Sequence, residues 1–382
     1  MENFIAYNPT KLHFGKDVVK DLGTTIERIG KNVLFMYGKG SIQKNGIYDA
    51  VIEQLESIGA NVTEYSGIKS NPVVEDVERA AELGILKHTD VILAVGGGSV
   101  IDSAKITGLS IANHTKPWSY MKQQVKPQKT IPLVAVLTVA ATGTEMNPAA
   151  VLQNPKTGEK LGYVHPLNYP RHSFLDPAYT QSVPANYTAY GVADLIAHSF
   201  EAYFGSGEAT LSDRFVEAIV KEAMEYGPQL LNNLEDYELR AKIMWAATNA
   251  LNGLTNYGRK AGDWGVHDIG HNLSLLFDMP HGATLSIVYP AWLKEMKQHI
   301  PDRIAELGKQ LFDVDSAEET IYKLEQMFVA IDCPIRLQDM DISKEKQEEI
   351  TELMLKNQVN GYVHQLNDEQ RKAIVTNMFA EK

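Results

Sequence analysis

At 382 residues the chain is longer than a single hydrophobic core usually supports, so two domains are expected. Hydrophobic residues make up 44% of the sequence and charged residues 22%, a balance typical of globular proteins that excludes disordered and fibrous classes. The net charge is −12 and there is no long run of Lys or Arg, which argues against nucleic acid and anionic membranes as partners.

The start of the chain and its cysteine usage indicate where the protein works. Residues 1–14 mix polar with apolar side chains and therefore lack the uninterrupted apolar core of a signal peptide. The apolar stretch 131–141 is too short to cross a bilayer and contains Pro132, which favours a buried strand. The lone cysteine, Cys333, excludes an intramolecular disulfide and is interpreted as a structural thiol. We expect a cytoplasmic protein.

Up to about residue 183, short β-branched apolar runs alternate with amphipathic stretches. Strand-like runs lie at residues 33–37, 91–95 and 131–137, and the stretch 46–58 fits a crossover helix. Parallel strands joined by helices show this alternation, and α/β proteins place their ligands where such strands end. The sequence predicts an α/β, Rossmann-like, dinucleotide-binding domain over residues 1–183.

The run 91–95 leads into Gly96-Gly97-Gly98-Ser99 and then into a helix-like segment that carries Asp102 and Lys105. Glycines let backbone amides approach an anion without a Cβ clash, and the next helix adds free N–H groups and a favourable dipole. The segment is a candidate phosphate cradle, and the hydroxyls of residues 138–144 can line the same groove. A glycine turn is often only a turn, however, and this one is not the usual GxGxxG.

After Pro184 strand-like runs become scarce. Long helical patterns cover residues 187–204, 212–231 and 238–254. The boundary is expected within residues 176–184, where two prolines and several polar residues interrupt the periodicity. A helical second domain is predicted over residues 184–382.

Asp194 and His198 lie among apolar neighbours in the first of these helical patterns. Because they are four residues apart, their side chains face one way. A buried carboxylate requires a counter-charge, and a divalent cation beside a neutral imidazole provides one. An exposed helical Asp–His pair is the alternative that this motif alone leaves open.

Three of the chain's 11 histidines cluster in residues 262–282. His267 and His271 share a helix face, and His281 follows Pro280 at a turn that can fold back over them. A single histidine on an apolar face is usually a core residue, but three of them beside a separate Asp–His pair indicate a metal site. Spacing alone does not separate the ligands from the remaining histidine.

Together these segments resemble the iron-containing alcohol dehydrogenase family, most closely its NADPH-dependent butanol dehydrogenase and aldehyde reductase branch. The resemblance spans essentially the whole chain, through GGGSVIDSAK at 96–105, TVAATGTEMN at 138–147, ADLIAHSFE at 193–201, and DWGVHDIGHNLS through MPHG at 263–282. It implies a dehydroquinate synthase-like α/β domain, an all-α metal-binding domain and a homodimer.

The resemblance also implies roles for single residues. It implies one divalent ion, Fe²⁺ with Zn²⁺ and Ni²⁺ as alternatives, bound by Asp194, His198, His267 and His281. The remaining histidine, His271, would lie beside the nicotinamide and substrate as the catalytic residue. The implied cofactor contacts are Asn71, Gly97, Gly98, Ser99, Asp102, Thr138, Thr142 and Lys160.

One departure from the wider family bears on cofactor choice. NAD-preferring members tend to carry an acidic residue after the strand at 33–37, where this chain reads Gly38-Lys39-Gly40-Ser41. A carboxylate there would bind the ribose 2′-hydroxyl and repel a 2′-phosphate. Its absence predicts NADP(H), with cofactor contacts at Gly38, Lys39 and Ser41.

The predicted function is that of a metal-dependent alcohol dehydrogenase or aldehyde reductase, which transfers a hydride between NADP(H) and small aliphatic, butanol-like substrates. Near the predicted ligands only Arg259 and Lys260 are obvious cations, too few for an anionic substrate. Two alternatives stay open: a glycerol or polyol dehydrogenase of the same superfamily, and a non-catalytic metal or nucleotide sensor.

Overall fold

The computed structural model describes residues 1–379, which pack into two compact units. The sheet unit comprises Tyr7–Val183 and Leu234–Met244, and the helical unit comprises Met1–Ala6, Pro184–Asn233 and the residues from Trp245 onward. The predicted boundary at 183/184 therefore does not account for two segments: Met1–Ala6, which belong to the helical unit, and Leu234–Met244, which belong to the sheet unit. Phe4 stacks on Tyr257, which places the first residues in the helical unit, and Met244 packs into the core of the sheet unit.

The sheet unit is built on a parallel sheet with the strand order β1-β8-β5-β4-β2-β3. Its strands are β1 (Lys11–Phe14), β2 (Asn32–Tyr37), β3 (Asn61–Tyr65), β4 (Val91–Gly96), β5 (Leu133–Leu137) and β8 (His172–Leu175). Every residue of β4 and β5 is buried, which is typical of parallel strands covered on both faces. The runs predicted at 33–37, 91–95 and 131–137 correspond to β2, β4 and β5, and the predicted fold class is confirmed.

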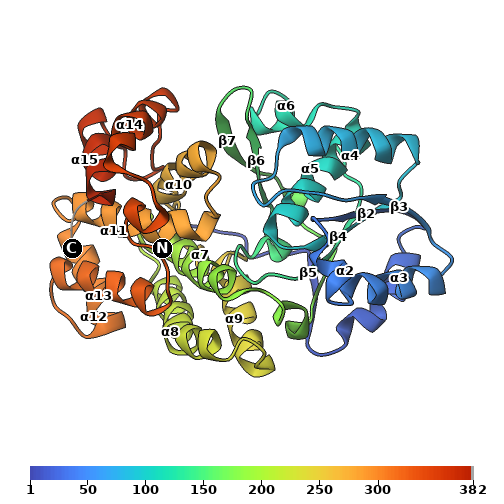
Figure 1. Cartoon of the computed structure of the whole chain (residues 1–382), viewed down its shortest axis with the longest axis horizontal. Coiled ribbons are helices and arrows are strands. Elements are labelled where there is room, and N and C mark those ends of the chain that lie inside the picture. Colours follow the sequence, from blue (N-terminus) through green and yellow to red (C-terminus); the bar gives the residue numbers. More distant parts are fainter. Residues whose placement is uncertain (380–382) are drawn as a thin grey trace. The chain divides into compact units, whose positions relative to one another are not determined.

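Helices cover both faces of this sheet (Figure 1). One face carries α1 (Leu22–Glu27), α2 (Ser41–Lys44) and α3 (Ile47–Ser57), and the other carries α4 (Val74–Leu86) and α5 (Gly98–Asn113). Because successive side chains of a strand point to opposite faces, Phe35 packs with the first set and Leu34 with the second. The unit also contains α6 (Pro117–Met121), the antiparallel hairpin β6 (Ala149–Asn154) and β7 (Glu159–Val164), and the short helices η1 (Val18–Asp21), η2 (Thr144–Met146), η3 (Pro166–Asn168) and η4 (Pro177–Thr180).

In the helical unit, α7 (Ala185–Tyr203) and α11 (His281–Met296) pack against each other. Both helices are buried over most of their length, as expected for helices that are apolar on nearly all sides. The other elements are α8 (Thr210–Asn232), α10 (Gly265–Phe277), α12 (Pro301–Phe312), α13 (Ala317–Ala330), η5 (Leu337–Met340), η6 (Lys344–Lys346), α14 (Gln347–Lys356) and α15 (Asp368–Met378), while α9 (Tyr237–Ala250) has residues in both units. In the part of the chain described, no helix is long and apolar enough to span a bilayer.

Candidate functional site

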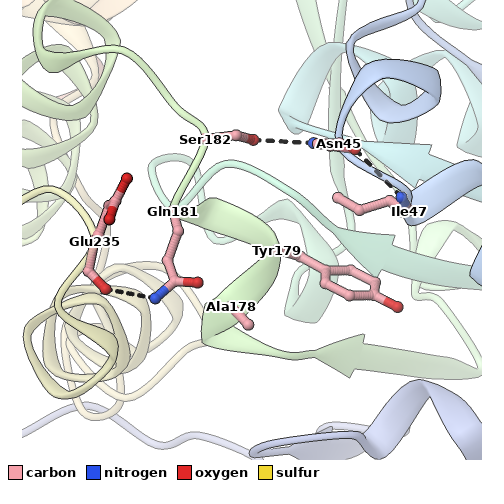
Figure 2. A pocket seen from close by; sticks show the side chains of 7 residues that line it. All are labelled: Asn45, Ile47, Ala178, Tyr179, Gln181, Ser182 and Glu235. Carbon is pink, nitrogen blue, oxygen red and sulfur yellow. Dashed lines mark hydrogen bonds between the residues drawn. The ribbon is translucent and has the colours of Figure 1, made fainter.

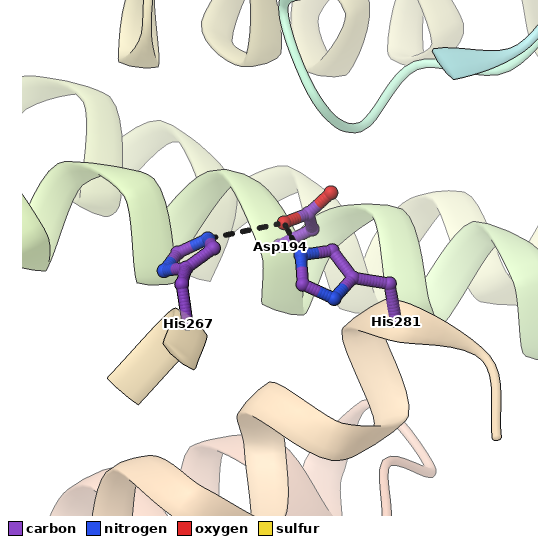
Figure 3. A group of neighbouring side chains, drawn as sticks. All are labelled: Asp194, His267 and His281. Carbon is purple, nitrogen blue, oxygen red and sulfur yellow. Dashed lines mark ion pairs between the residues drawn. The ribbon is translucent and has the colours of Figure 1, made fainter. Parts of the chain in front are cut away.

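Three helices of the helical unit bring the predicted metal ligands together around Asp194. His267 comes from α10 and His281 is the first residue of α11, and both rings are turned toward the Asp194 side chain on α7 (Figure 3). Their Nε2 atoms lie 4.0 and 3.9 Å from Asp194 Oδ1. His198, one turn further along α7, places Nδ1 3.2 Å from the same oxygen.

These separations approach, and for His267 and His281 slightly exceed, those of side chains that share a cation. Zinc–nitrogen and zinc–oxygen bonds are about 2.0–2.2 Å long, so two ligand atoms on one ion lie roughly 3–3.5 Å apart. Ligand atoms of Asp194, His267 and His281 all lie within 4.8 Å of one another, and the carboxylate and imidazole donors suit a divalent transition metal. His198 contacts Asp194 but falls outside this group, so its role as fourth ligand stays a prediction.

Burial keeps one of these imidazoles neutral. Desolvation and the neighbouring His267 hold the pKa of His198 well below its usual value, although the backbone carbonyl of Asp194 acts in the opposite direction. A neutral imidazole offers the lone pair that a metal requires. The electrostatics of α7 therefore favour a ligating over a charged His198.

His271 lies one turn beyond His267 on α10 and is buried. Its ring centroid is 5.5 Å from that of His281, and it is not among the residues grouped around Asp194. The structure thus separates His271 from the ligand group, which spacing alone did not do. Its predicted catalytic role is compatible with this position.

Sequence reasoning missed Glu201, which lies seven residues after Asp194 on the same side of α7. The Glu201 side chain is buried, and its Oε1 lies 2.7 Å from His267 Nδ1. Burial raises the pKa of Glu201 to about 8, against the effect of hydrogen bonds from the backbone N–H groups of His267 and Trp264. The spacing of positions 194, 198 and 201 was the available signal, because residues four and three apart share a helix face.

Trp264 precedes α10 in a left-handed backbone conformation, with φ of 66°. A residue other than glycine pays about 1–2 kcal/mol for this conformation, and such strain is common at functional sites. Its indole ring meets the imidazoles of His267 and His198 edge-on, with centroid distances of 5.3 and 6.1 Å. Trp264 therefore forms an aromatic wall beside the predicted metal ligands His198 and His267.

In the sheet unit, the predicted phosphate cradle lies between β4 and α5. A Cβ atom at Gly98 would meet the side chain of Thr142 at 2.8 Å, so the glycine turn and the loop after β5 are in close contact. Thr138 is also joined to this edge, because its N–H donates to the carbonyl of Gly96 at 3.0 Å. Gly97 is the N-cap of α5. The structure thus brings these predicted residues to one edge of the sheet.

The remaining predicted contacts reach the same edge. The hydroxyl of Ser99 donates to the carbonyl of Ser70, and the next residue, Asn71, accepts a hydrogen bond of 2.8 Å from the buried Lys160. Gly38, Lys39 and Ser41 follow β2, which pairs with β4, and the latter two are exposed. Parallel strands end on one side of a sheet, so these residues lie at the carboxyl ends of neighbouring strands.

Asp102, another predicted cofactor contact, is held by hydrogen bonds within the sheet unit. It is partly buried, and its Oδ1 and Oδ2 accept hydrogen bonds of 2.5 and 2.9 Å from the Thr144 hydroxyl and the Val151 N–H. Lys105 Nζ donates to the same hydroxyl at 2.6 Å and to the Ala149 carbonyl at 2.6 Å. Desolvation lowers the pKa of Lys105 to about 8, against the attraction of Asp102. These groups anchor the loop after β5.

Two other predictions concern side chains of the helical unit, Arg259 and Cys333. Arg259, considered as a substrate-binding cation, is buried and places Nη2 2.6 Å from Asp213 Oδ1. Its charge is therefore used within the fold. Cys333 is buried, and desolvation raises its thiol pKa to about 12, as expected of a structural thiol.

A cavity of about 370 Å³ in the sheet unit involves none of the predicted site residues (Figure 2). It is lined by Asn45, Ile47, Ala178, Tyr179, Gln181, Ser182 and Glu235. Two hydrogen bonds join its walls, from Asn45 Nδ2 to Ser182 Oγ at 2.9 Å and from Gln181 Nε2 to the Glu235 carbonyl at 2.5 Å. Four of the lining residues are thus hydrogen-bonded to one another in pairs.

Comparison with known proteins gives matches over both halves of the chain. Residues 9–177 match the family described as iron-containing alcohol dehydrogenase, and residues 188–379 match the C-terminal part of the Fe-containing alcohol dehydrogenase family. A probable NADH-dependent butanol dehydrogenase 1 of Bacillus subtilis is 39% identical over 98% of this chain and 99% of its own length. The NADPH-dependent aldehyde reductase YqhD of Escherichia coli is 36% identical over 84% of this chain and 82% of its own.

A solved structure agrees with these sequence matches. The crystal structure of an NADH-dependent butanol dehydrogenase A from Thermotoga maritima superimposes with a TM-score of 0.96 at 35% identity. The match covers 100% of this chain and 99% of that one. The same fold is therefore shared over the full length of both chains.

Proposed function

This chain belongs to the iron-containing alcohol dehydrogenase family, and we propose that it reduces small aliphatic aldehydes with NADPH, or oxidises the corresponding alcohols, at a metal site centred on Asp194. The family assignment makes it an alcohol dehydrogenase that uses a nicotinamide cofactor and a divalent metal. The observation that carries the proposal is the convergence of Asp194, His267 and His281.

Asp194, His267 and His281 would hold the ion, with His198 as the fourth ligand. When bound, the metal supplies a Lewis acid that acidifies an alcohol or polarises a carbonyl, and the nicotinamide gives or takes the hydride. His271 lies beyond the ligand group and would hold or relay the proton at a ring nitrogen. The indole of Trp264 would exclude water from the ligand side chains.

The proposal of an uncharged substrate is supported by the contacts of two arginines in the helical unit. Arg259 pairs with Asp213, and Arg303 places Nη2 2.6 Å from the same Asp213 oxygen while lying over the ring of Tyr203. Both guanidinium groups therefore serve the fold, which leaves them unsuited to clamp a carboxylate or phosphate.

NADP(H) as the preferred cofactor is supported by the end of β2. The exposed Lys39 and Ser41 supply a cation and a hydroxyl for a 2′-phosphate. On the neighbouring strand, the oxygens of Glu64 accept hydrogen bonds of 2.6 and 2.9 Å from Tyr37 and Tyr48, which holds this carboxylate against the tyrosines. Relatives of this chain are named for NADH and for NADPH, so the family assignment leaves the preference open and the proposal rests on these residues.

The proposal is tested by adding Fe²⁺ or Zn²⁺ to metal-free protein with NADPH and butyraldehyde, and following the loss of nicotinamide absorbance. Turnover that requires the metal is expected. Binding of metal and NADPH without turnover would instead indicate a sensor. The predicted homodimer and cytoplasmic location stay predictions.

A further inference from the structure

We propose that Glu201 is a positioning residue for the metal site, which fixes the tautomer and the orientation of His267. This inference rests on the proposed metal function, because it assigns Glu201 a task only if His267 is a ligand. Glu201 lies on α7 with Asp194 and His198, and it contacts α10, which carries His267. It therefore joins the two helices that contribute most of the predicted ligands.

The contact with the imidazole determines which nitrogen carries hydrogen. Glu201 Oε1 lies 2.7 Å from His267 Nδ1, and both carboxyl oxygens already accept hydrogen bonds from backbone N–H groups, which marks Oε1 as the acceptor of this contact. Nδ1 of a neutral His267 must then be the protonated nitrogen, and Nε2 keeps its lone pair. Nε2 is the atom that faces Asp194 Oδ1, at 4.0 Å. The carboxylate thus leaves the ligating nitrogen free of hydrogen on the side of the metal site.

The same carboxylate also fixes the backbone that carries His267. Glu201 Oε1 accepts a hydrogen bond of 3.0 Å from the N–H of His267, and Oε2 accepts one of 2.5 Å from the N–H of Trp264. These N–H groups belong to the N-cap and the first turn of α10, where backbone donors lack partners within the helix. The indole of Trp264 has no acceptor to cap them, so a carboxylate from α7 takes that place.

Three N–H donors therefore converge on one buried side chain, which explains why a carboxylate is required there. In Glu201→Gln, an amide nitrogen would face either a backbone N–H or the imidazole. The first arrangement leaves a donor opposed to a donor, and the second favours the tautomer with hydrogen on Nε2. Either outcome weakens ligation, and loss of such partners typically lowers metal affinity about 10–100-fold.

The test measures Zn²⁺ affinity of metal-free protein by competition with a chromophoric chelator, for the wild type and Glu201→Gln. We expect about 10–100-fold weaker binding in the variant. Glu325→Gln is the matched control, since Glu325 is a largely buried glutamate of the same unit that pairs with Lys294 and Arg336. Its thermal stability should fall while its Zn²⁺ affinity stays within about twofold of wild type.

The tautomer is measured independently by ¹⁵N NMR of histidine-labelled, metal-free wild-type protein. We expect hydrogen on Nδ1 of His267, with the signal assigned through His267→Ala. Hydrogen on Nε2, or unchanged Zn²⁺ affinity in Glu201→Gln, would overturn the inference, and the NMR test does not require the variant to fold. If His267→Ala itself bound Zn²⁺ normally, the proposed metal site would be wrong as well.

Discussion

The Thr144 hydroxyl donates a hydrogen bond of 2.5 Å to Asp102 Oδ1 and accepts one from Lys105, so the loop after β5 is tied to the helix that begins at the glycine turn. Gly98 and Thr142, which lie on these two segments, are in close contact. The shape of the predicted cofactor groove therefore depends on a buried polar cluster below it.

Thr144→Val is expected to lower the free energy of unfolding by about 1–3 kcal/mol, because it leaves the partly buried Asp102 carboxylate and the buried Lys105 ammonium each short of one partner. NADPH affinity should fall with it as the loop loosens. Chemical denaturation and fluorescence titration with NADPH measure the two effects. The control is Thr107→Val on α5, the helix that carries Asp102 and Lys105, since the buried Thr107 hydroxyl has no hydrogen-bond partner among the described residues. Equal losses of stability and of NADPH affinity in the two variants would contradict the role of Thr144 in anchoring the loop after β5.

Lys105 predicts a specific pH dependence of stability. Its pKa in the folded state is about 8, below the ordinary 10.5, so the unfolded state binds more protons between these values. Stability relative to a Lys105→Met variant should therefore rise with pH from about 8 to 10.5. Denaturation curves of both proteins across this range provide the comparison. If the free energy of unfolding of the wild type relative to Lys105→Met fell over this range, the folded protein would stabilise the ammonium form of Lys105, contrary to its lowered pKa.

The two histidines of α10 should respond differently to replacement. His267→Ala is expected to abolish metal retention and turnover, whereas His271→Ala should keep the metal and lose about 100-fold or more in kcat. Elemental analysis and steady-state kinetics on the same preparations separate the outcomes. Equal metal loss in both variants would refute the assignment of His271 outside the ligand set.

Cofactor choice is predicted to respond to Lys39. Lys39→Asp should lower kcat/KM for NADPH by about tenfold relative to NADH, because a charge-assisted contact is replaced by repulsion. Lys44→Asp, at the other end of α2, is the control for a change of charge. If the NADPH to NADH ratio is the same in both variants and the wild type, the assignment of Lys39 to the 2′-phosphate is wrong.

Short β-branched apolar runs were enough to predict the strands β2, β4 and β5 of the parallel sheet. Leu34 and Phe35 pack against helices on opposite faces of the sheet, and the glycine turn follows β4 as expected. The exchange of residues 234–244 into the sheet unit could not be predicted, because a helical pattern such as that of α9 does not show where its two ends pack.

The site, like the sheet, was predicted only in part. Spacing placed Asp194 and His198 on one face of a helix and indicated a metal, but it did not show that the same face extends to Glu201. The cofactor contact of Asp102 was implied by the family resemblance alone, and the sequence did not show that its carboxylate accepts hydrogen bonds from Thr144 and Val151. A pattern of residue types gives the direction of a side chain, and only the folded chain shows its partners.

The proposed function requires that one cation is held by Asp194 and the imidazoles around it. Anomalous diffraction at the metal absorption edge, from crystals of protein loaded with Fe²⁺ or Zn²⁺, locates such an ion. We expect a single strong peak about 2.0–2.2 Å from Asp194, His198, His267 and His281. An ion bound elsewhere, or a loaded and active enzyme with no peak among these side chains, would contradict it.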